Sequence, residues 1–276
     1  MELSAVWKIQ HFPAGLMKPY ELAFPGFDDR FWISAKVPGD VHSTLIERNI
    51  IDHPYFGHND SKSRWIEDEE WWYRGQFNYE VDEKSDERHE LVFEGLDTFS
   101  TVFVNGLEVG TTNNMLMAHS FDITKIIRTG WNCIAVKFDP LRKHHEQKEL
   151  FQWSSYTKER PWLRKAAMNF GWDWGPRMVT VGIWGKVRME RTRVAKLDSI
   201  FARTVNAGLE EAAILVDIDV KSYRKDQQLE CEVILVDQTG EHVADEKVSL
   251  ESKVGTLDLL VKSPQLWWTH DLGDPY

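Results

Sequence analysis

The chain alternates apolar and polar residues over several short segments, and this period of two is the pattern that most constrains its fold. The alternation is clearest in residues 134–138, 214–220 and 231–236. It indicates strands that bury one face and leave the other in water. Asn105-Gly106 is a hairpin signal, because a two-residue type I′ turn needs a positive φ at both central residues. These features together predict antiparallel β-sheet.

Helical patterns are few, and they mark short segments. Asp40 can cap a helix that carries Val41, Leu45 and Ile46, and residues 144–150 can form another turn or two. The sequence lacks the regular alternation of strand and helix patterns that a parallel sheet requires. Short strands separated by turn residues fit two antiparallel sandwiches better. We therefore predict an all-β fold.

A chain of 276 residues exceeds the usual size of one domain, and a change in composition predicts where two domains meet. Tryptophans are frequent in the first part of the chain and then disappear until Trp267-Trp268. Between these parts valine, isoleucine and aspartate alternate, as they do in an immunoglobulin-like sandwich. We place the boundary near residues 191–196 and predict one domain over 1–192 and a second over 193–276.

The charge and the apolar segments of the chain argue against two classes of partner. A formal net charge of −11, with no basic stripe, argues against nucleic acid, which binds to clustered lysines and arginines. No segment approaches about 18 uninterrupted apolar residues, so no membrane partner is expected. The N-terminal residues carry no secretory signal pattern. Cys133 and Cys231 are interpreted as buried, reduced thiols, and the expected location is the cytoplasm.

Residues that could bind a metal or a cofactor do not form a recognised pattern. His42, His53 and His58 lie in one stretch, but their spacings of 11 and 5 match no defined ligand arrangement. The acidic run at 67–70 is interpreted as a solvated edge rather than a cation site. Neither a phosphate-binding glycine loop nor a Cys-x-x-Cys pair is present. We therefore expect no metal and no cofactor.

The stretch Asn-Phe-Gly-Trp-Asp-Trp-Gly-Pro at 169–176 allows two interpretations. It can be a strand that buries its tryptophans and leaves Asp173 in water. It can instead be a loop that binds a sugar, with the indole of Trp172 on the apolar face of the ring and the Asp173 carboxylate accepting hydroxyl protons. The flanking Gly171 and Gly175 favour an unusual turn.

Seven short motifs stand in a fixed order along the chain. They are PGDVH at 38–42, EWWYR at 70–74, FEGLDT at 93–98, VFVNG at 102–106, RK at 164–165, GWDWGP at 171–176 and GIW at 182–184. Together they resemble the N-terminal half of the β-mannosidases of glycoside hydrolase family 2. The FEGLDT and VFVNG motifs resemble the family as a whole, whereas WDWGP resembles the mannosidase branch. A weaker resemblance, carried by PQLWW at 264–268, continues to the end of the chain.

This resemblance implies a jelly-roll (galactose-binding-like) β-sandwich, an immunoglobulin-like β-sandwich truncated before its last strand, and a (β/α)₈ barrel beyond this chain. It implies retaining hydrolysis by two glutamates of that barrel, roughly 5 Å apart, so no catalytic residue is expected here. It assigns Asp173, with Trp172 beside it, to the hydroxyls of the terminal mannose. Trp174 itself is interpreted as a core residue. Arg164-Lys165 is interpreted as a structural salt link rather than a partner of Asp173.

We therefore expect the non-catalytic N-terminal portion of a retaining β-mannosidase, which scaffolds the catalytic barrel and supplies a substrate-binding loop. Its expected partners are β-mannoside oligosaccharides and its own C-terminal barrel. One alternative is a free-standing carbohydrate-binding module, which needs only the aromatic platform. Another is an interaction scaffold, in which Asp173 has no part in turnover.

Overall fold

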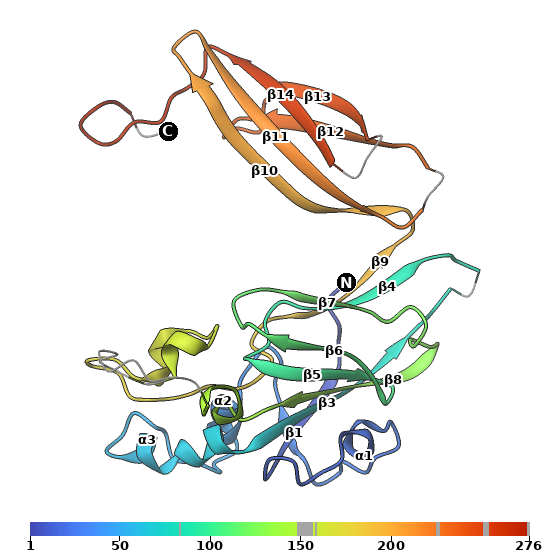
Figure 1. The fold of residues 1–276 in the computed structure, drawn as a ribbon, viewed down its shortest axis with the longest axis vertical. Helices are drawn as coiled ribbons and strands as arrows, with labels where there is room; N and C mark the ends of the chain where they lie inside the picture. The colour runs from blue at the N-terminus through green and yellow to red at the C-terminus, as the bar shows by residue number, and fades with distance from the viewer. Residues whose placement is uncertain (83, 148–156, 158, 225–226, 251–253, 275–276) are drawn as a thin grey trace. The chain divides into compact units, whose positions relative to one another are not determined.

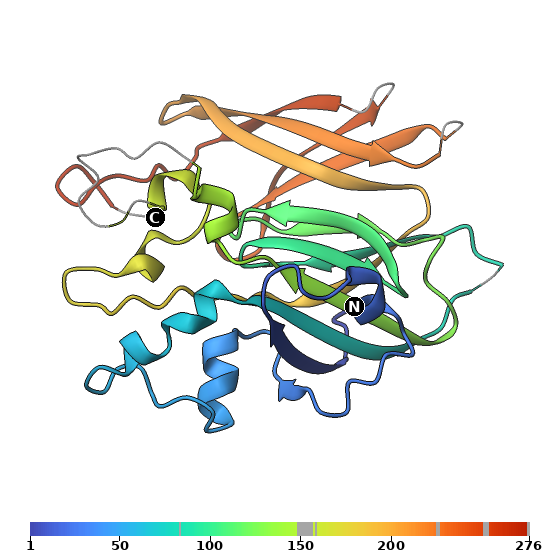
Figure 2. The ribbon, with the colours of Figure 1, turned by 60° about the horizontal axis from the view of Figure 1, so that its bottom comes forward.

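The computed structural model describes residues 1–82, 84–147, 157, 159–224, 227–250 and 254–274. The chain divides into two compact units, Met1–Arg191 and Thr192–Tyr276, and each is considered by itself (Figures 1 and 2). Strands dominate both units, which confirms the predicted all-β class. No helix in the described ranges has the length and apolar character needed to cross a bilayer.

The unit Met1–Arg191 is built on two sheets. The larger has six strands in the order β2-β1-β3-β8-β5-β6, and all of its neighbouring pairs are antiparallel. Its strands are β1 Val6–Phe12, β2 Ile33–Ala35, β3 Glu70–Tyr79, β5 Phe99–Val104, β6 Leu107–Asn113 and β8 Gly130–Phe138. The smaller has the order β7-β4-β9, with β4 Arg88–Phe93, β7 His119–Asp122 and β9 Val187–Thr192.

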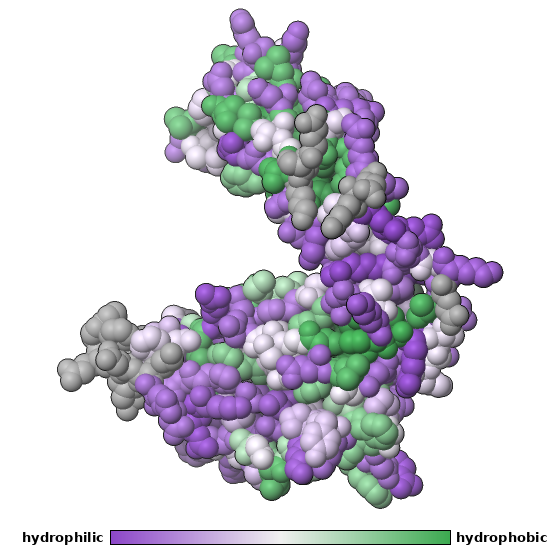
Figure 3. Space-filling model, turned by 45° about the vertical axis from the view of Figure 1, so that its right-hand side comes forward, coloured by the Kyte–Doolittle hydropathy of each residue, from purple (hydrophilic) through white to green (hydrophobic). Residues whose placement is uncertain are grey.

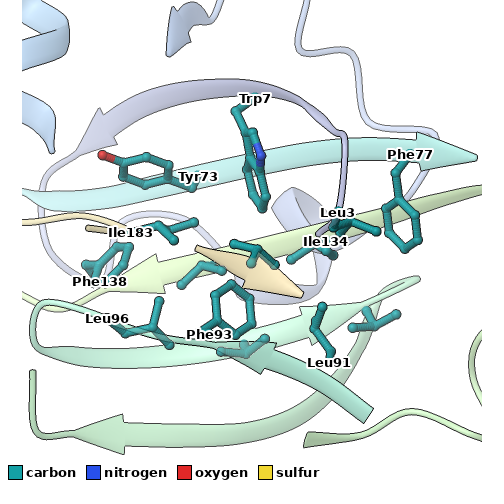
Figure 4. Close-up of a cluster of buried hydrophobic side chains, with 14 of the residues drawn as sticks. Leu3, Trp7, Tyr73, Phe77, Leu91, Phe93, Leu96, Ile134, Phe138 and Ile183 are labelled. Carbon is teal, nitrogen blue, oxygen red and sulfur yellow. The ribbon is translucent and has the colours of Figure 1, made fainter. Parts of the chain in front are cut away.

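The main core of this unit lies between the two sheets (Figure 4). Trp7 on β1 points toward the layer that holds Phe93 on β4, and Tyr73 on β3 lies in the same core. Tyr73, Leu91 and Phe93 are fully buried. Burial of a large apolar side chain contributes about 1.5–3 kcal/mol, so this layer supplies a rigid base for the loops at the edges of the sheets.

Two local sequence predictions are confirmed in this unit. Asn105 and Gly106 have φ of 50° and 87°, and they join β5 to β6 in a two-residue hairpin turn. The side chain of Asp40 accepts a hydrogen bond of 3.1 Å from the backbone N–H of Ser43 and caps a helix. Both signals are local, because the turn and the cap depend on adjacent residues alone.

The helical segments of this unit are short. They are α1 Pro19–Ala23, α2 Val41–Glu47, α3 Asn59–Lys62, α4 Arg142–His145, η1 Arg64–Asp68, η2 Arg160–Trp162 and η3 Ala167–Phe170. Asp40 caps α2, which carries the predicted apolar residues. The helix expected over 144–150 is present as α4 up to His145, and residues 148–150 lie outside the described part of the chain.

The unit Thr192–Tyr276 is a smaller sandwich of two sheets. A three-stranded sheet, β10-β11-β14, packs on a pair, β12-β13. The strands are β10 Ala195–Ala207, β11 Glu211–Ser222, β12 Leu229–Val236, β13 His242–Leu250 and β14 Val254–Lys262. Buried Val216 and Ile218 on β11 and Leu257 and Leu259 on β14 form most of its core. Apolar and polar groups are interspersed on its visible surface (Figure 3).

The two cysteines lie in different units and are both free. Cys133 on β8 is buried, as predicted. Cys231 on β12 is only partly buried, so the prediction of a fully buried thiol is wrong at this position. The reason is that β12 belongs to a two-stranded sheet, where alternate side chains remain partly open to solvent.

Candidate functional site

The stretch singled out at 169–176 forms a tight turn. The helical turn η3 ends at Phe170 and is followed by Gly171, whose φ of 95° lies in the region that favours glycine. The backbone N–H of Trp172 then donates to the carbonyl of Gly175 at 3.1 Å, and the reverse bond measures 3.3 Å. Asp173 and Trp174 therefore occupy the two tip positions. The stretch is therefore a turn, and the strand interpretation is wrong. The sugar-binding part of the loop interpretation stays a prediction.

The side chains of this turn are exposed. Trp172 and Trp174 are 43% and 84% exposed, so the assignment of Trp174 to the core is wrong. Trp174 occupies a tip position of the turn, and no element in the described part of the chain covers it. The two indoles meet edge to face at 6.4 Å, and the guanidinium of Arg160 lies 5.3 Å from the centre of the Trp172 ring. The turn thus presents indole surface to solvent.

Asp173 stands at the exposed tip of the turn. It makes no hydrogen bond or ion pair with any described residue, so its carboxylate oxygens are available to an external donor. A carboxylate beside an exposed indole can bind hydroxyl groups while the ring contacts an apolar face. The prediction that Asp173 and Trp172 bind substrate is not tested by this geometry and stays a prediction.

The stems of the loop are joined to each other directly below the turn. The backbone N–H of Met178 donates to the carbonyl of Asn169 at 3.0 Å, and the Asn169 side-chain amide donates to the carbonyl of Met178 at 3.3 Å. Phe170 packs with Leu163 and Val179 in a small buried cluster. The loop over residues 170–177 is consequently closed at its base by both polar and apolar contacts.

A buried ion pair lies below these stems. The Nζ of Lys165 donates to both carboxylate oxygens of Asp97, and the two side chains are 0% and 3% exposed. Burial lowers the pKa of Lys165, and the adjacent Asp97 carboxylate limits that shift. The interpretation of Lys165 as part of a structural salt link is confirmed. Sequence reasoning did not identify Asp97 as its partner, although Asp97 is one of two acids, with Glu94, in the largely apolar run 91–104.

Arg177 clamps the exit stem of the loop between two acidic side chains. Its Nε and Nη2 donate to the Glu67 carboxylate at 3.0 and 2.5 Å, and its Nη1 lies 2.7 Å from the carboxylate of Glu159. Burial alone would raise the pKa of Glu159. A backbone hydrogen bond and Arg177 outweigh that effect, so the pKa lies below its ordinary value.

The acidic run at 67–70 is the predicted solvated edge only in part: Asp68 is exposed, whereas Glu67 and Glu70 are engaged by the fold. Glu67 is held by Arg177, and Glu70 is 3% exposed and accepts a hydrogen bond of 2.8 Å from the Trp72 indole N–H. The run begins in η1 and ends in the central strand β3, which carries it from the surface into the core. Among the described residues, no group of three or more histidine, cysteine or acidic side chains is placed to bind a metal ion.

Comparison with known proteins identifies the class. The chain belongs to the glycosyl hydrolase 2 galactose-binding domain-like family, whose model matches residues 8–185. That match covers the strands of the first unit from within β1 through β8 and the turn that carries Asp173, and it ends before β9. The FEGLDT and VFVNG motifs lie within it, so the resemblance to glycoside hydrolase family 2 is confirmed.

Several curated relatives of the chain are named β-mannosidases. Beta-mannosidase B of Aspergillus oryzae is 32% identical over 253 residues, which cover 87% of this chain and 29% of that protein. Beta-mannosidase B of Thermothelomyces thermophilus is 31% identical over 251 residues, with 87% and 28% covered. The chain therefore spans less than a third of the length of these relatives.

Solved structures agree on the fold over nearly the whole chain. The β-D-mannosidase of Dictyoglomus thermophilum matches with a TM-score of 0.80 and 28% identity, over 98% of this chain and 32% of that one. The exo-chitosanase of Amycolatopsis orientalis matches with a TM-score of 0.68 and 23% identity, over 99% and 30%. At that level of identity the second likeness concerns the fold alone.

Proposed function

We propose that this chain is the N-terminal, non-catalytic portion of a retaining β-mannosidase that hydrolyses terminal, non-reducing β-D-mannose residues. In the whole protein it scaffolds a (β/α)₈ barrel and supplies Asp173 and Trp172 to the sugar-binding site. The similarity to proteins titled β-mannosidase supports the activity. The coverage of less than a third of those proteins supports a separate catalytic portion.

The observation that carries this proposal is the unpartnered carboxylate at an aromatic tip. Asp173 has exposed indoles on both sides and no partner among the described side chains or backbone groups. A hydrogen bond to a charged acceptor contributes about 1.5–3 kcal/mol once water is excluded. The turn gains that energy when a sugar and the wall of a second domain close over it.

The acidic side chains beside the turn do not supply the chemistry by themselves. Glycoside hydrolysis with retention needs one carboxylic acid that donates a proton and one carboxylate that attacks the sugar. Glu67 and Glu159 share the guanidinium of Arg177, and the pKa of Glu159 is lowered rather than raised. This pair is therefore suited to holding the loop rather than to acid catalysis.

The test is the activity of Asp173 variants in the full-length enzyme. Loss of two hydrogen bonds at about 1.5–3 kcal/mol each predicts that Asp173→Ala lowers kcat/KM for an aryl β-mannoside by about two orders of magnitude or more. Asp173→Asn keeps one acceptor, so its kcat/KM should lie between that of the unmodified enzyme and that of Asp173→Ala. Asp258→Ala, which removes an exposed carboxylate on β14, is the matched control and should leave kcat/KM unchanged.

A free-standing carbohydrate-binding module is the second candidate, because the exposed indoles of Trp172 and Trp174 offer a platform without any further domain. Measurements on the isolated 276-residue chain distinguish the two candidate functions. Under our proposal it neither hydrolyses an aryl β-mannoside nor binds manno-oligosaccharides tightly in calorimetry. Tight binding by the isolated chain would favour the module. An Asp173→Ala enzyme with full activity would favour a pure interaction scaffold.

A further inference from the structure

The loop that carries Asp173 stands on a continuous chain of hydrogen bonds that reaches into the core. Lys165 bonds to Asp97 and to the backbone carbonyl of Thr180 at 2.7 Å. The Thr180 hydroxyl bonds to Asp97 at 2.7 Å and to the Asn169 side chain at 2.7 Å. Sugar binding at the tip requires none of these groups directly, so their arrangement calls for a separate explanation.

The chemistry of the groups fixes the direction of each bond. A hydroxyl carries a single proton, and the ionised Asp97 can only accept, so Thr180 donates to Asp97. The oxygen of Thr180 then accepts from the side-chain amide of Asn169, whose other amide proton points to the carbonyl of Met178. The donor and acceptor of each hydrogen bond are therefore determined, from the ion pair to the stem of the loop.

We propose that Thr180 is a positioning residue for substrate binding. It couples the buried Asp97–Lys165 pair to Asn169 and so holds the stems of the loop where Asp173 meets the sugar. This inference rests on the proposed role of Asp173. The Thr180 hydroxyl contacts Asp97, Asn169 and Lys165, none of which belongs to the turn at 172–175. Its effect on the enzyme is expected to pass entirely through the loop.

The burial of these hydrogen-bonded groups explains why they can hold the loop in place. Lys165 and Asp97 are almost fully buried, and each has a defined partner within hydrogen-bond distance. Any shift of the stems would leave a charged or amide group unpaired in the interior, where that is costly. A loop held in this way loses little conformational entropy when it binds. Displacement of a binding group by about 1 Å can lower the rate by about 10²-fold.

A double-mutant cycle in the full-length enzyme tests this. Thr180→Val keeps the shape of the side chain and removes only the hydroxyl. We expect it to lower kcat/KM for an aryl β-mannoside by about tenfold or more. In an Asp173→Ala background the same change should cost less than about twofold, because the group being positioned is gone. Thr180→Ser restores the hydroxyl and should restore most of the activity.

A control separates positioning from general stability. Thr44→Val removes another buried hydroxyl, whose bond of 3.0 Å to the Asp40 carbonyl stays within the first turn of α2. It should leave kcat/KM unchanged at a temperature where the enzyme is folded. If Thr180→Val fails to fold, Asn169→Ala replaces it in the cycle, since it breaks the link to the stem and leaves the ion pair intact.

The outcomes are distinct. Loss of activity in Thr180→Val that vanishes in the Asp173→Ala background supports the inference. Equal losses in both backgrounds overturn it, because they indicate a structural effect that does not pass through Asp173. Normal activity in Thr180→Val, with Asp173→Ala impaired, overturns this inference and leaves the proposed function standing. An Asp173→Ala enzyme with normal activity overturns the proposed function, and this inference with it.

Discussion

Asp97 and Asp173 are the same residue type in one compact unit, and their surroundings are opposite. Asp97 is 2% exposed and bonds to Lys165 and Thr180. Asp173 lies at the exposed tip of a turn and has no partner in the described structure. The buried carboxylate forms hydrogen bonds within the fold, whereas the exposed one forms none with the described residues. The base of the loop thus contributes to stability, and the proposed sugar binding is assigned to its tip.

The largest expected difference between the two carboxylates is in the free energy of unfolding. Asp97→Ala leaves the Lys165 ammonium buried without its partner, and loss of one member of a buried pair costs about 3–5 kcal/mol. Asp173→Ala removes nothing that the fold uses, so its unfolding midpoint should equal that of the unmodified chain. Urea unfolding of the 276-residue chain measures both. Equal midpoints for the two variants would show that Asp97 and Asp173 do not differ in their contribution to stability.

A smaller effect is expected at the clamp of the loop. Arg177→Ala leaves Glu67 and Glu159 without their shared partner, and each is largely buried. Loss of such a charged hydrogen-bond partner costs about 1–3 kcal/mol, to be measured by the same urea unfolding. The matched control is Arg30→Ala, which breaks a bidentate pair with Asp28 on the open surface. That variant should not shift the midpoint, because water screens the pair.

Acid should destabilise the interior of this unit. Burial lowers the pKa of His42, and Lys165 adds to that effect, although Asp40 and Glu67 oppose it. Burial lowers the pKa of His89 and of His144 in the same direction. Between these lowered values and about 6.5, the unfolded chain binds more protons than the folded chain, so stability falls as the pH drops below about 6.5.

Urea midpoints measured from pH 7.5 to pH 5 test this dependence. His42→Gln should flatten the curve, since it removes one of the three protons that bind on unfolding. Asp173→Asn should leave the curve unchanged and serves as the control. A midpoint that stays constant over this range would contradict the lowered histidine pKa values.

The smallest effect is expected for Trp174. Because its side chain is 84% exposed, Trp174→Ala should leave the unfolding midpoint unchanged, although tryptophan is usually a core residue. The indole should also be reached by acrylamide, so the variant loses part of the quenchable tryptophan fluorescence. Trp71→Ala is the contrast: that indole is fully buried in the core, and its loss costs about 3–5 kcal/mol.

Local features were predictable from the sequence to the extent that neighbouring residues determine them. The Asn105-Gly106 turn and the Asp40 cap follow from backbone φ preferences and from a side chain that reaches three residues ahead. The glycine at 171 likewise indicated a special turn, and its φ of 95° agrees. The all-β class followed from the period-two alternation, because each strand must bury one face.

Exposure and pairing were not predictable in the same way. A tryptophan and a run of acids were assigned by the average behaviour of their residue types, and both assignments failed at Trp174 and at Glu70. The partner of Lys165 lies 68 positions away at Asp97, a distance over which spacing carries no information. Whether a charge is buried depends on which distant segment packs against it.

The sequence by itself determined the strands, the hairpin, the cap and the family, because these depend on local preferences and on motifs read in order. Only the tertiary structure decided that Asp97 lies beneath the loop and Asp173 at its tip. The physical reason is that a carboxylate has the same intrinsic chemistry at both positions. Its role is fixed by the dielectric and by the hydrogen-bond donors that folding brings to it.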